Sequence, residues 1–251
     1  MHALPGNFLG LVRTLGHAAP LLPNGRPQYR SGPKGGSRNP PGTFHVKRPV
    51  DLAPGDDYHS RVDLGLSGKA AIVGGASLGI GRAIAMGLAR EGCRVALAAR
   101  RQDLLERTAR DIHEATGVDT LPVVCDMSQP RDIRSFVALA AQRFGRIDVV
   151  VNNAGGPPVG RFEDHDDDAW RHALDQNFFS VVRVIREALP HLRAAGGGRI
   201  INVLSWAVKQ PLDGLILSNS ARLAVVAPEM RRDQGDALET QIVRAQVCPP
   251  Y

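Results

Sequence analysis

The sequence predicts an α/β fold with a doubly wound parallel sheet in three layers, and three observations support this. From Lys69 onward, short runs of Val, Ile and Ala alternate with longer amphipathic stretches, which is typical of repeated strand-helix units. Hydrophobic residues make up 43% of the chain but aromatic residues only 5%, which favours close packing of helices on a sheet. A chain of 251 residues is long enough for one buried core and short for two.

Residues 1–62 differ in composition from the rest of the chain and predict a disordered tail. They hold half of the 18 prolines and show no sustained strand or helix periodicity. Such a segment cannot bury enough apolar surface to offset the entropy lost on ordering. We therefore expect one folded domain over residues 63–251. The tail is interpreted either as a transit peptide or as a segment without a role.

The excess of positive charge lies in this tail, so nucleic acid is not an expected partner. The whole chain carries a formal net charge of +6, but residues 63–251 hold 23 basic and 22 acidic side chains. A near-neutral domain does not have the basic face that binds a phosphate backbone. No apolar run approaches the roughly 18 residues that span a bilayer, so no membrane location is expected either.

The cysteines predict reduced thiols in a cytoplasmic protein. Cys93, Cys125 and Cys248 are far apart in the sequence and none belongs to a CxxC pair, which argues against a disulfide framework and against zinc. The acidic stretch Glu163–Asp168, which includes His165, is the other candidate for a metal. Acids in front of a helix cap its first turn and complement its dipole, so we predict no metal.

The alternating apolar and amphipathic stretches also predict where each strand and helix lies. The predicted strands are Ala70–Gly74, Arg94–Ala99, Leu121–Cys125, Ile147–Asn152, Arg199–Leu204 and a weaker Ile242–Cys248. The predicted helices are Gly81–Glu91, Gln102–Thr116, Arg131–Phe144, Asp167–Arg193 and one that opens near Ser218. Pro228 and Gly235 should break this last helix, because Pro costs about 3 kcal/mol and Gly about 1 kcal/mol in a helix interior.

A glycine-rich turn follows the first predicted strand and opens the next helix. It runs from Gly74 to Gly81 and reads GGASLGIG. Glycines let the backbone approach a pyrophosphate, and the N-terminus of the helix presents free N–H groups. An ordinary strand-to-helix turn would use similar glycines, but the strand before and the helix after favour a Rossmann-type dinucleotide site. The residues that we assign to cofactor binding in this turn are Gly75, Ser77, Gly79, Ile80 and Gly81.

A second motif, with the sequence NNAG from Asn152 to Gly155, lies at the end of the fourth predicted strand. In a doubly wound sheet this end faces the cofactor crevice. Asn amides there can tie neighbouring strand ends together, and the small residues leave room for a ribose or a ring. Alone, such a loop would be interpreted as structural, but together with the glycine turn it is specific, and we assign Asn153, Ala154 and Gly155 to cofactor binding.

Together the two motifs resemble those of the classical short-chain dehydrogenase/reductase (SDR) family. The resemblance runs from about Leu64 to about residue 227, although Gly74 stands where the family usually has Thr. It implies an NAD(P)(H)-dependent oxidoreductase that transfers a hydride between nicotinamide and a small-molecule carbonyl or alcohol. It also implies that Asp126 accepts a hydrogen bond from the adenine amino group; a cap or turn role is the alternative for this residue.

The end of the second strand predicts NADP(H) as the cofactor. An acid there would bind a ribose 2′-hydroxyl, whereas a base accommodates a 2′-phosphate. This chain has Arg100 and Arg101 at the position and no acid before Asp103. Leu78 lacks the basic side chain that many NADP-using relatives place before the second glycine, which leaves NAD(H) as an alternative.

The resemblance also implies a catalytic set of Asn, Ser, Tyr and Lys, which this chain matches only in part. Asn177 fits the Asn and Ser205 fits the Ser, but Ser218 and Arg222 occupy the Tyr and Lys places. A serine hydroxyl is a far weaker acid than a phenol, whose pKa is about 10, and arginine does not deprotonate. Some relatives that resemble β-ketoacyl carrier-protein reductases share this pattern.

Several alternatives stay open at this point. Lys209 or Asp213 is a second candidate for the proton donor, with a surface role as the default for each. A catalytically impaired dinucleotide-binding protein, or a truncated product, is the alternative to an active reductase. By the resemblance, a substrate loop, a final helix and a last strand are expected to be missing, which would leave any homo-oligomer interface incomplete. An interaction protein that acts through the basic tail is supported by composition alone.

Overall fold

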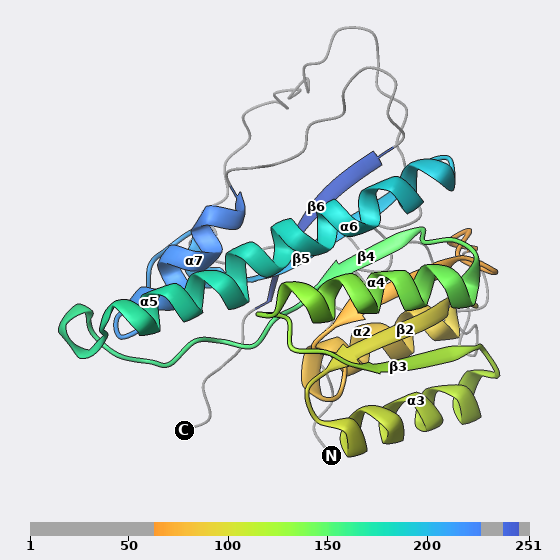
Figure 1. The fold of residues 1–251 in the computed structure, drawn as a ribbon, viewed down its shortest axis with the longest axis horizontal. Helices are drawn as coiled ribbons and strands as arrows, with labels where there is room; N and C mark the ends of the chain where they lie inside the picture. The colour runs from red at the N-terminus through yellow and green to blue at the C-terminus, as the bar shows by residue number, and fades with distance from the viewer. Residues whose placement is uncertain (1–62, 227–237, 246–251) are drawn as a thin grey trace, which may run out of the picture.

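The computed structural model describes residues 63–226 and 238–245, which form alternating strands and helices (Figure 1). The strands are β1 (Ala70–Gly74), β2 (Arg94–Ala99), β3 (Thr120–Val124), β4 (Val149–Asn152), β5 (Gly198–Ser205) and β6 (Leu238–Ala245). The helices are α2 (Gly79–Arg90), α3 (Gln102–Thr116), α4 (Pro130–Phe144), α5 (Asp167–Leu174), α6 (Ser180–Ala194) and α7 (Ile216–Val226). Shorter helical segments are η2 (Phe162–Asp164), η3 (Asp175–Phe179) and η4 (Trp206–Val208). The predicted tail over residues 1–62 lies outside the described residues.

The described strands form one parallel sheet in the order β3-β2-β1-β4-β5-β6. At its centre, Ile72 of β1 is in register with Ala96 of β2 and with Val150 of β4. The chain builds outward from β1 to β3 and then returns to the other side of β1 with β4. Doubly wound sheets bind ligands at the carboxyl ends of the strands where this reversal occurs. The predicted sheet architecture is confirmed.

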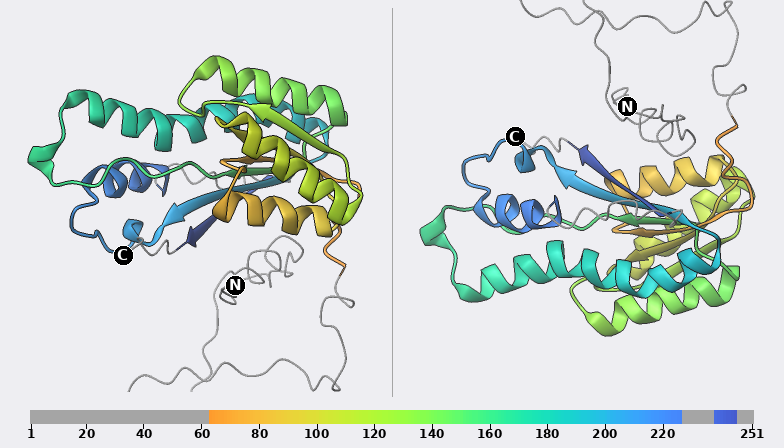
Figure 2. Two further views of the ribbon diagram at one scale, coloured as in Figure 1. Left: turned by 90° about the horizontal axis from the view of Figure 1, so that it is seen from below. Right: turned by 90° about the horizontal axis from the view of Figure 1, so that it is seen from above.

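Helices cover both faces of the sheet, so the protein has three layers (Figure 2). Side chains of one strand alternate between the two faces. Val73 of β1 packs in a buried cluster with Leu88 of α2 and Leu105 of α3. Its neighbour Ile72 packs in a second buried cluster with Phe136 of α4. The strongly apolar strands of the sequence follow from this burial on both faces.

The observed boundaries differ from the predicted ones in a few places. Most shifts are of one or two residues, but β6 begins at Leu238, four residues before its predicted start. The predicted helix Asp167–Arg193 has the right span, yet η3 is a π-helix that divides it into α5 and α6. A π-segment adds a residue to one turn, and a hydrophobic period does not reveal it. The break predicted at Pro228 and Gly235 lies outside the described residues.

The acidic stretch in front of α5 serves as a helix cap. The Asp166 side chain accepts a hydrogen bond from the backbone N–H of Ala169 at 2.9 Å. Arg171, one turn further on, pairs with Asp167 and Asp168 on the same helix. The capping interpretation of these acids is therefore confirmed.

Two of the cysteines are buried and free, as predicted. Burial raises the pKa of Cys93 and of Cys125 to about 12, and the nearby carboxylates of Asp148 and Asp132 respectively add to the rise. Such thiols stay protonated and unreactive at neutral pH. Cys248 lies outside the described residues. Of the helices in the described ranges, none combines the length and the apolarity needed to cross a bilayer.

A buried carboxylate fixes the start of the central strands. Asp148 accepts hydrogen bonds from the backbone N–H of Ala70 at 2.9 Å and from Arg146 at 2.6 and 2.8 Å, and Lys69 lies 3.4 Å away. Burial alone would raise the pKa of Asp148. The hydrogen bonds from Arg146 and Ala70 and the charge of Lys69 outweigh that effect and hold the pKa below its usual value.

We expect Asp148→Asn to lower the free energy of unfolding by about 2 kcal/mol at pH 7, because a charged acceptor of several bonds is lost. The folded pKa lies below the value of about 3.9 in an unfolded chain, so Asp148 stabilises the fold fully above that pH. Its contribution disappears as the pH falls through the folded pKa. Urea unfolding from pH 7 downward should show the wild type and the variant converging in acid.

Asp119→Asn is the matched control, because Asp119 pairs with Arg143 at the surface. Exposed ion pairs contribute little to stability, so this variant should unfold almost like the wild type. Equal losses in the two variants would show that Asp148 is not a special anchor.

Candidate active site

The glycine turn between β1 and α2 forms a cradle of backbone atoms. Gly75 and Gly79 have φ values of +59° and +57°, which favour glycine. A Cβ on Gly81 would lie 2.2 Å from the carbonyl oxygen of Gly75, so the turn and the helix touch through glycine alone. No atom lies within 4 Å of the position of a Cβ on Gly79, which leaves this side of the cradle open.

The N-terminus of α2 opens into this cradle. Its N-cap residue, Leu78, makes no side-chain cap, and the first turn contains no acidic residue. A helix start of this kind leaves N–H groups and a partial positive charge for an anion. Ile80 is 37% exposed beside it. The turn therefore fits a dinucleotide pyrophosphate both in space and in charge.

The floor of the cradle is held by contacts from other elements. The backbone N–H of Ala76 donates to the carbonyl of Ala98 in β2 at 3.0 Å. Ser77 is buried, and its carbonyl oxygen accepts a hydrogen bond from Thr108 Oγ1 of α3 at 2.9 Å. Thr108 is a residue that sequence reasoning missed, because it lies inside a helix and no motif marks it.

The two Asn residues at the end of β4 tie strand ends together, as predicted. Asn152 Nδ2 donates to Asn202 Oδ1 of β5 at 2.8 Å. Asn153 Nδ2 lies 3.2 Å from the carbonyl oxygen of Gly74 and 3.4 Å from that of Gly75. Asn153 thereby joins the end of β4 to the glycine turn, and the two motifs form one site.

The ends of β2 and β3 add charged groups to the same edge of the sheet. Arg100 and Arg101 are exposed directly after β2. Asp126, after β3, accepts hydrogen bonds from the N–H and the Oγ of Ser128 at 2.9 and 2.8 Å. Burial would raise the pKa of Asp126, but these bonds and the nearby charges of Arg100 and His172 lower it. Arg100 and Asp126 thus lie close enough to interact.

Asn177 lies in the π-helical segment η3. This segment joins α5 to α6 in one long helical rod, residues 167–194 (Figure 1). The side chain is buried, and its Nδ2 donates to the carbonyl oxygen of Ala173 at 3.2 Å. The neighbouring Gln176 places its Nε2 3.4 Å from the position of a Cβ on Gly155. π-Segments are frequent at functional sites, and this one lies beside the NNAG loop.

Ser218 and Arg222 of α7 form a pair that reaches the same loop. Arg222 Nη1 donates a hydrogen bond to Ser218 Oγ, and Arg222 Nη2 lies 3.4 Å from the carbonyl oxygen of Gly155. Ser218 is buried. Burial also lowers the pKa of the Arg222 guanidinium, which nevertheless stays charged at neutral pH. The structure thus brings both residues together with the predicted cofactor loop.

Ser205 ends β5, and its Oγ accepts a hydrogen bond from the N–H of Ala207 at 3.2 Å. Within the described residues no hydrogen bond joins Ser205 to Ser218 or to Arg222. The alternative donors Lys209 and Asp213 are exposed on the loop that follows, in keeping with the surface role that is their default.

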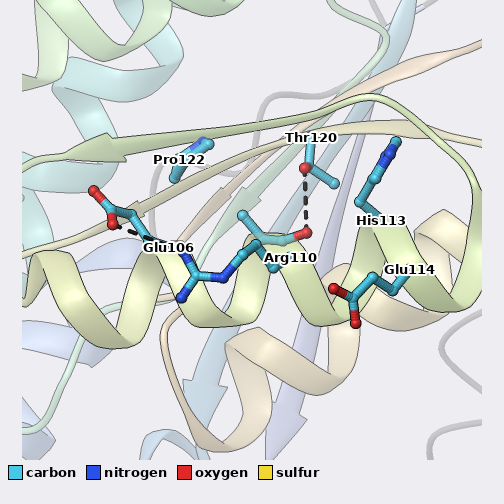
Figure 3. A pocket seen from close by; sticks show the side chains of 7 residues that line it. Glu106, Arg110, His113, Glu114, Thr120 and Pro122 are labelled. Carbon is cyan, nitrogen blue, oxygen red and sulfur yellow. Dashed lines mark hydrogen bonds and ion pairs between the residues drawn. The ribbon is translucent and has the colours of Figure 1, made fainter.

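A hollow of about 350 Å³ lies elsewhere, between α3 and β3 (Figure 3). Glu106 and Arg110 form an ion pair on its rim, and Thr120 Oγ1 donates to the carbonyl oxygen of Ala109 at 3.2 Å. None of the glycine turn, the NNAG loop or the α7 pair lines this hollow. It is therefore a surface feature of the edge of the sheet, separate from the candidate site.

The fold and the glycine turn define a doubly wound, Rossmann-type α/β domain. The chain belongs to the short chain dehydrogenase family, whose model matches residues 69–251. The family resemblance seen in the sequence is confirmed.

Individual relatives agree with this assignment. A Streptomyces violaceoruber protein that bears the name granaticin polyketide synthase ketoacyl reductase 1 is 35% identical over 188 residues, which cover 72% of this chain and 66% of that protein. The crystal structure of L-sorbose reductase from Gluconobacter frateurii, in complex with NADPH and L-sorbose, has a TM-score of 0.65 and 36% identity, and the match covers 67% of this chain and 64% of the reductase.

A crystal structure of NAD⁺-bound xylitol dehydrogenase is also similar, with a TM-score of 0.62 and 27% identity, covering 65% of this chain and 63% of that one. The chain thus spans about two thirds of the length of these relatives, or slightly less.

Proposed function

We propose that this chain is an NADP(H)-dependent oxidoreductase that transfers a hydride between the nicotinamide and a carbonyl or alcohol of a small-molecule substrate. One observation supports this most strongly. The glycine turn, the open N-terminus of α2 and Asn153 form a single cradle at the switch point of the sheet. In a member of the short chain dehydrogenase family, that cradle fits a nicotinamide dinucleotide.

Each part of the cofactor has candidate residues in this chain. The turn residues Gly75, Ser77, Gly79, Ile80 and Gly81 would hold the pyrophosphate through backbone N–H groups. Asp126 would accept from the adenine amino group, and Arg100 with Arg101 would bind a 2′-phosphate. The loop residues Asn153, Ala154 and Gly155 would lie against the nicotinamide half. When bound, the cofactor supplies or accepts the hydride.

The α7 pair would handle the oxygen of the substrate. In reduction, the carbonyl carbon gains the hydride and the oxygen gains a proton. Arg222 would stabilise the developing negative charge on that oxygen, since a guanidinium is a fixed cation in a partly buried site. Ser205 and Ser218 would position the oxygen by hydrogen bonds, and Asn177 would hold water for proton delivery. Because no phenol occupies the Ser218 position, we expect proton delivery to limit turnover.

The test combines cofactor binding with turnover on one preparation. The wild type should bind NADPH, measured by fluorescence titration, and should oxidise it in the presence of small aldehydes or ketones. Gly81→Ala should weaken NADPH at least about tenfold, or about 1.4 kcal/mol, because its Cβ would meet the Gly75 carbonyl at 2.2 Å. Gly117→Ala is the control, since Gly117 ends α3 with open space around it; its positive φ, which Gly81 lacks, adds backbone strain away from the candidate site, so this control is a strict one.

The two readings of the chain predict different results in this experiment. Binding without turnover would favour a dinucleotide-binding protein that does not catalyse. Ser218 and Arg222, at the places of the family's Tyr and Lys, support that second candidate. Absence of NADPH binding in the folded wild type would contradict both.

The protein is proposed to act in the cytoplasm. Its buried thiols, Cys93 and Cys125, are free and unpaired with each other, which suits a reducing compartment.

A further inference from the structure

Arg183, on the first turn of α6, contacts residues from two other segments. Its Nη1 donates to the carbonyl oxygen of Ser128 at 3.1 Å. Its Nη2 donates to Asp175 Oδ1 at 2.7 Å, and the guanidinium lies 5.2 Å from the centre of the Phe179 ring. The Arg183 side chain is only 22% exposed, so these contacts are partly shielded from water.

The two residues that Arg183 holds on its own rod are the first and the last of η3. Asp175 begins this π-helical segment and Phe179 ends it, with the buried Asn177 midway between them. Asp175 receives the ion pair, and Phe179 receives the cation–π contact. Arg183 therefore contacts both ends of the π-helical segment η3 and would stabilise it; we call this set of contacts the brace.

The irregular turn decides the direction in which Asn177 points. A π-turn contains one residue more than an α-turn, and one residue in an α-helix corresponds to a rotation of about 100°. If η3 relaxed to regular α-helix, the residues before it would rotate by roughly that angle relative to α6. The side chains of Gln176 and Asn177 would then change direction, and Gln176 would leave its place beside Gly155 of the NNAG loop.

The third contact extends the brace to the other half of the site. Ser128 belongs to the loop after β3, and its N–H and hydroxyl both donate to Asp126, the candidate adenine ligand. Arg183 holds the carbonyl oxygen of the same Ser128. One guanidinium thus joins the loop that shapes the adenine site to the helix turn that carries Asn177.

We propose that Arg183 is a positioning residue that acts through Asn177 on the catalytic side and through the Asp126–Ser128 loop on the cofactor side. The proposal rests on the function proposed above for Asn177 and Asp126. Both effects would pass through the contacts of Arg183 with Ser128, Asp175 and Phe179. No sequence motif indicates this role, because the three contacts converge only in the folded chain.

The test uses Arg183→Met, which keeps the length and much of the apolar stem of the side chain but removes every donor. We expect kcat to fall about tenfold to a hundredfold, because small displacements of a catalytic group have effects of that size. We expect the Kd for NADPH to rise about threefold to tenfold, as for the loss of one hydrogen bond. Amide hydrogen exchange in residues 175–179 should become faster, while β1 and β4 stay protected.

Arg183→Lys separates the two arms of the brace. A lysine ammonium can pair with Asp175 but cannot reach Ser128 at the same time, because it lacks the planar fork of arginine. This variant should recover most of kcat and the slow exchange of 175–179 while leaving the Kd for NADPH raised. Arg134→Met is the matched control, since Arg134 pairs with Glu187 of α6 at 3.8 Å and is largely exposed.

The outcomes distinguish this proposal from the proposed function. If Arg183→Met matches Arg134→Met in kcat, in NADPH affinity and in amide exchange, the positioning role is wrong. A parallel loss of all three in Arg183→Met and Arg183→Lys would indicate a general packing role and would also overturn it. If the wild type binds NADPH without turnover, the catalytic part of the proposed function fails, and NADPH affinity and amide exchange still decide the role of Arg183.

Discussion

Replacing Ser218 by Tyr and Arg222 by Lys is expected to raise the rate of carbonyl reduction at saturating NADPH by about 10² to 10⁴, the usual contribution of a positioned general acid. A phenol with a pKa of about 10 releases a proton far more readily than a serine hydroxyl. A lysine ammonium one helical turn away would lower that pKa further by its charge. The positions are four residues apart on α7 and already in hydrogen-bond contact, so the new pair should meet.

Ser218→Phe with Arg222→Lys is the matched control for this double change. It adds almost the same volume at a buried position but has no proton to give, so any effect of crowding appears in both variants. NADPH affinity should be the same in the two double variants, because both carry the Arg222→Lys change next to Gly155 and neither alters the glycine turn. A gain in the Phe control equal to that in the Tyr variant would show that proton donation is not the cause.

A third result is possible, in which both double variants lose the wild-type activity. It would show that Ser218 and Arg222 themselves are the working groups, with the two-pronged contact of arginine required at the oxygen. No change in any rate, with NADPH binding intact, would place the chemistry away from α7.

Arg100→Asp is expected to reverse the order of cofactor affinities. The wild type should bind NADPH more tightly than NADH, because Arg100 supplies a charge-assisted contact to the 2′-phosphate. Such a contact is worth about 1.5–3 kcal/mol, so NADPH affinity should fall about tenfold to a hundredfold. An aspartate at the end of β2 would accept from the 2′-hydroxyl of NADH instead. Fluorescence titration with the two cofactors measures both constants.

Arg107→Asp controls for the change in net charge, since Arg107 is an exposed residue of α3, more than one helical turn after Arg101 in the chain. It should alter the two affinities little and keep their order. If Arg107→Asp weakens NADPH binding as much as Arg100→Asp does, the overall positive charge of this surface, and not a local contact with the 2′-phosphate, sets the preference for NADPH. Equal affinities for both cofactors before and after the Arg100 change would show that this residue does not read the 2′-position.

Local patterns were sufficient to predict most of the fold. β1, β2 and α3 begin and end at the predicted residues. The hydrophobic periods of strands and helices depend only on residues that are close together in the chain. The glycine turn and the NNAG motif were recognised for the same reason. The predicted start of β6 was less accurate, since its residues mix polar and apolar side chains without a clear period.

The sequence by itself determined the order of the elements, the parallel sheet and the identity of the glycine and Asn motifs, because each depends on residues close together in the chain. Only the tertiary structure decided how the site is supported. Thr108 meets Ser77 across 31 positions, Arg183 meets Ser128 across 55, and Arg222 meets Gly155 across 67. Such contacts depend on how helices pack on the sheet and which rotamers that packing permits, and no local period encodes them. The π-turn around Asn177 belongs to the same group, because no hydrophobic period reveals it and its two ends contact Arg183 only in the folded chain.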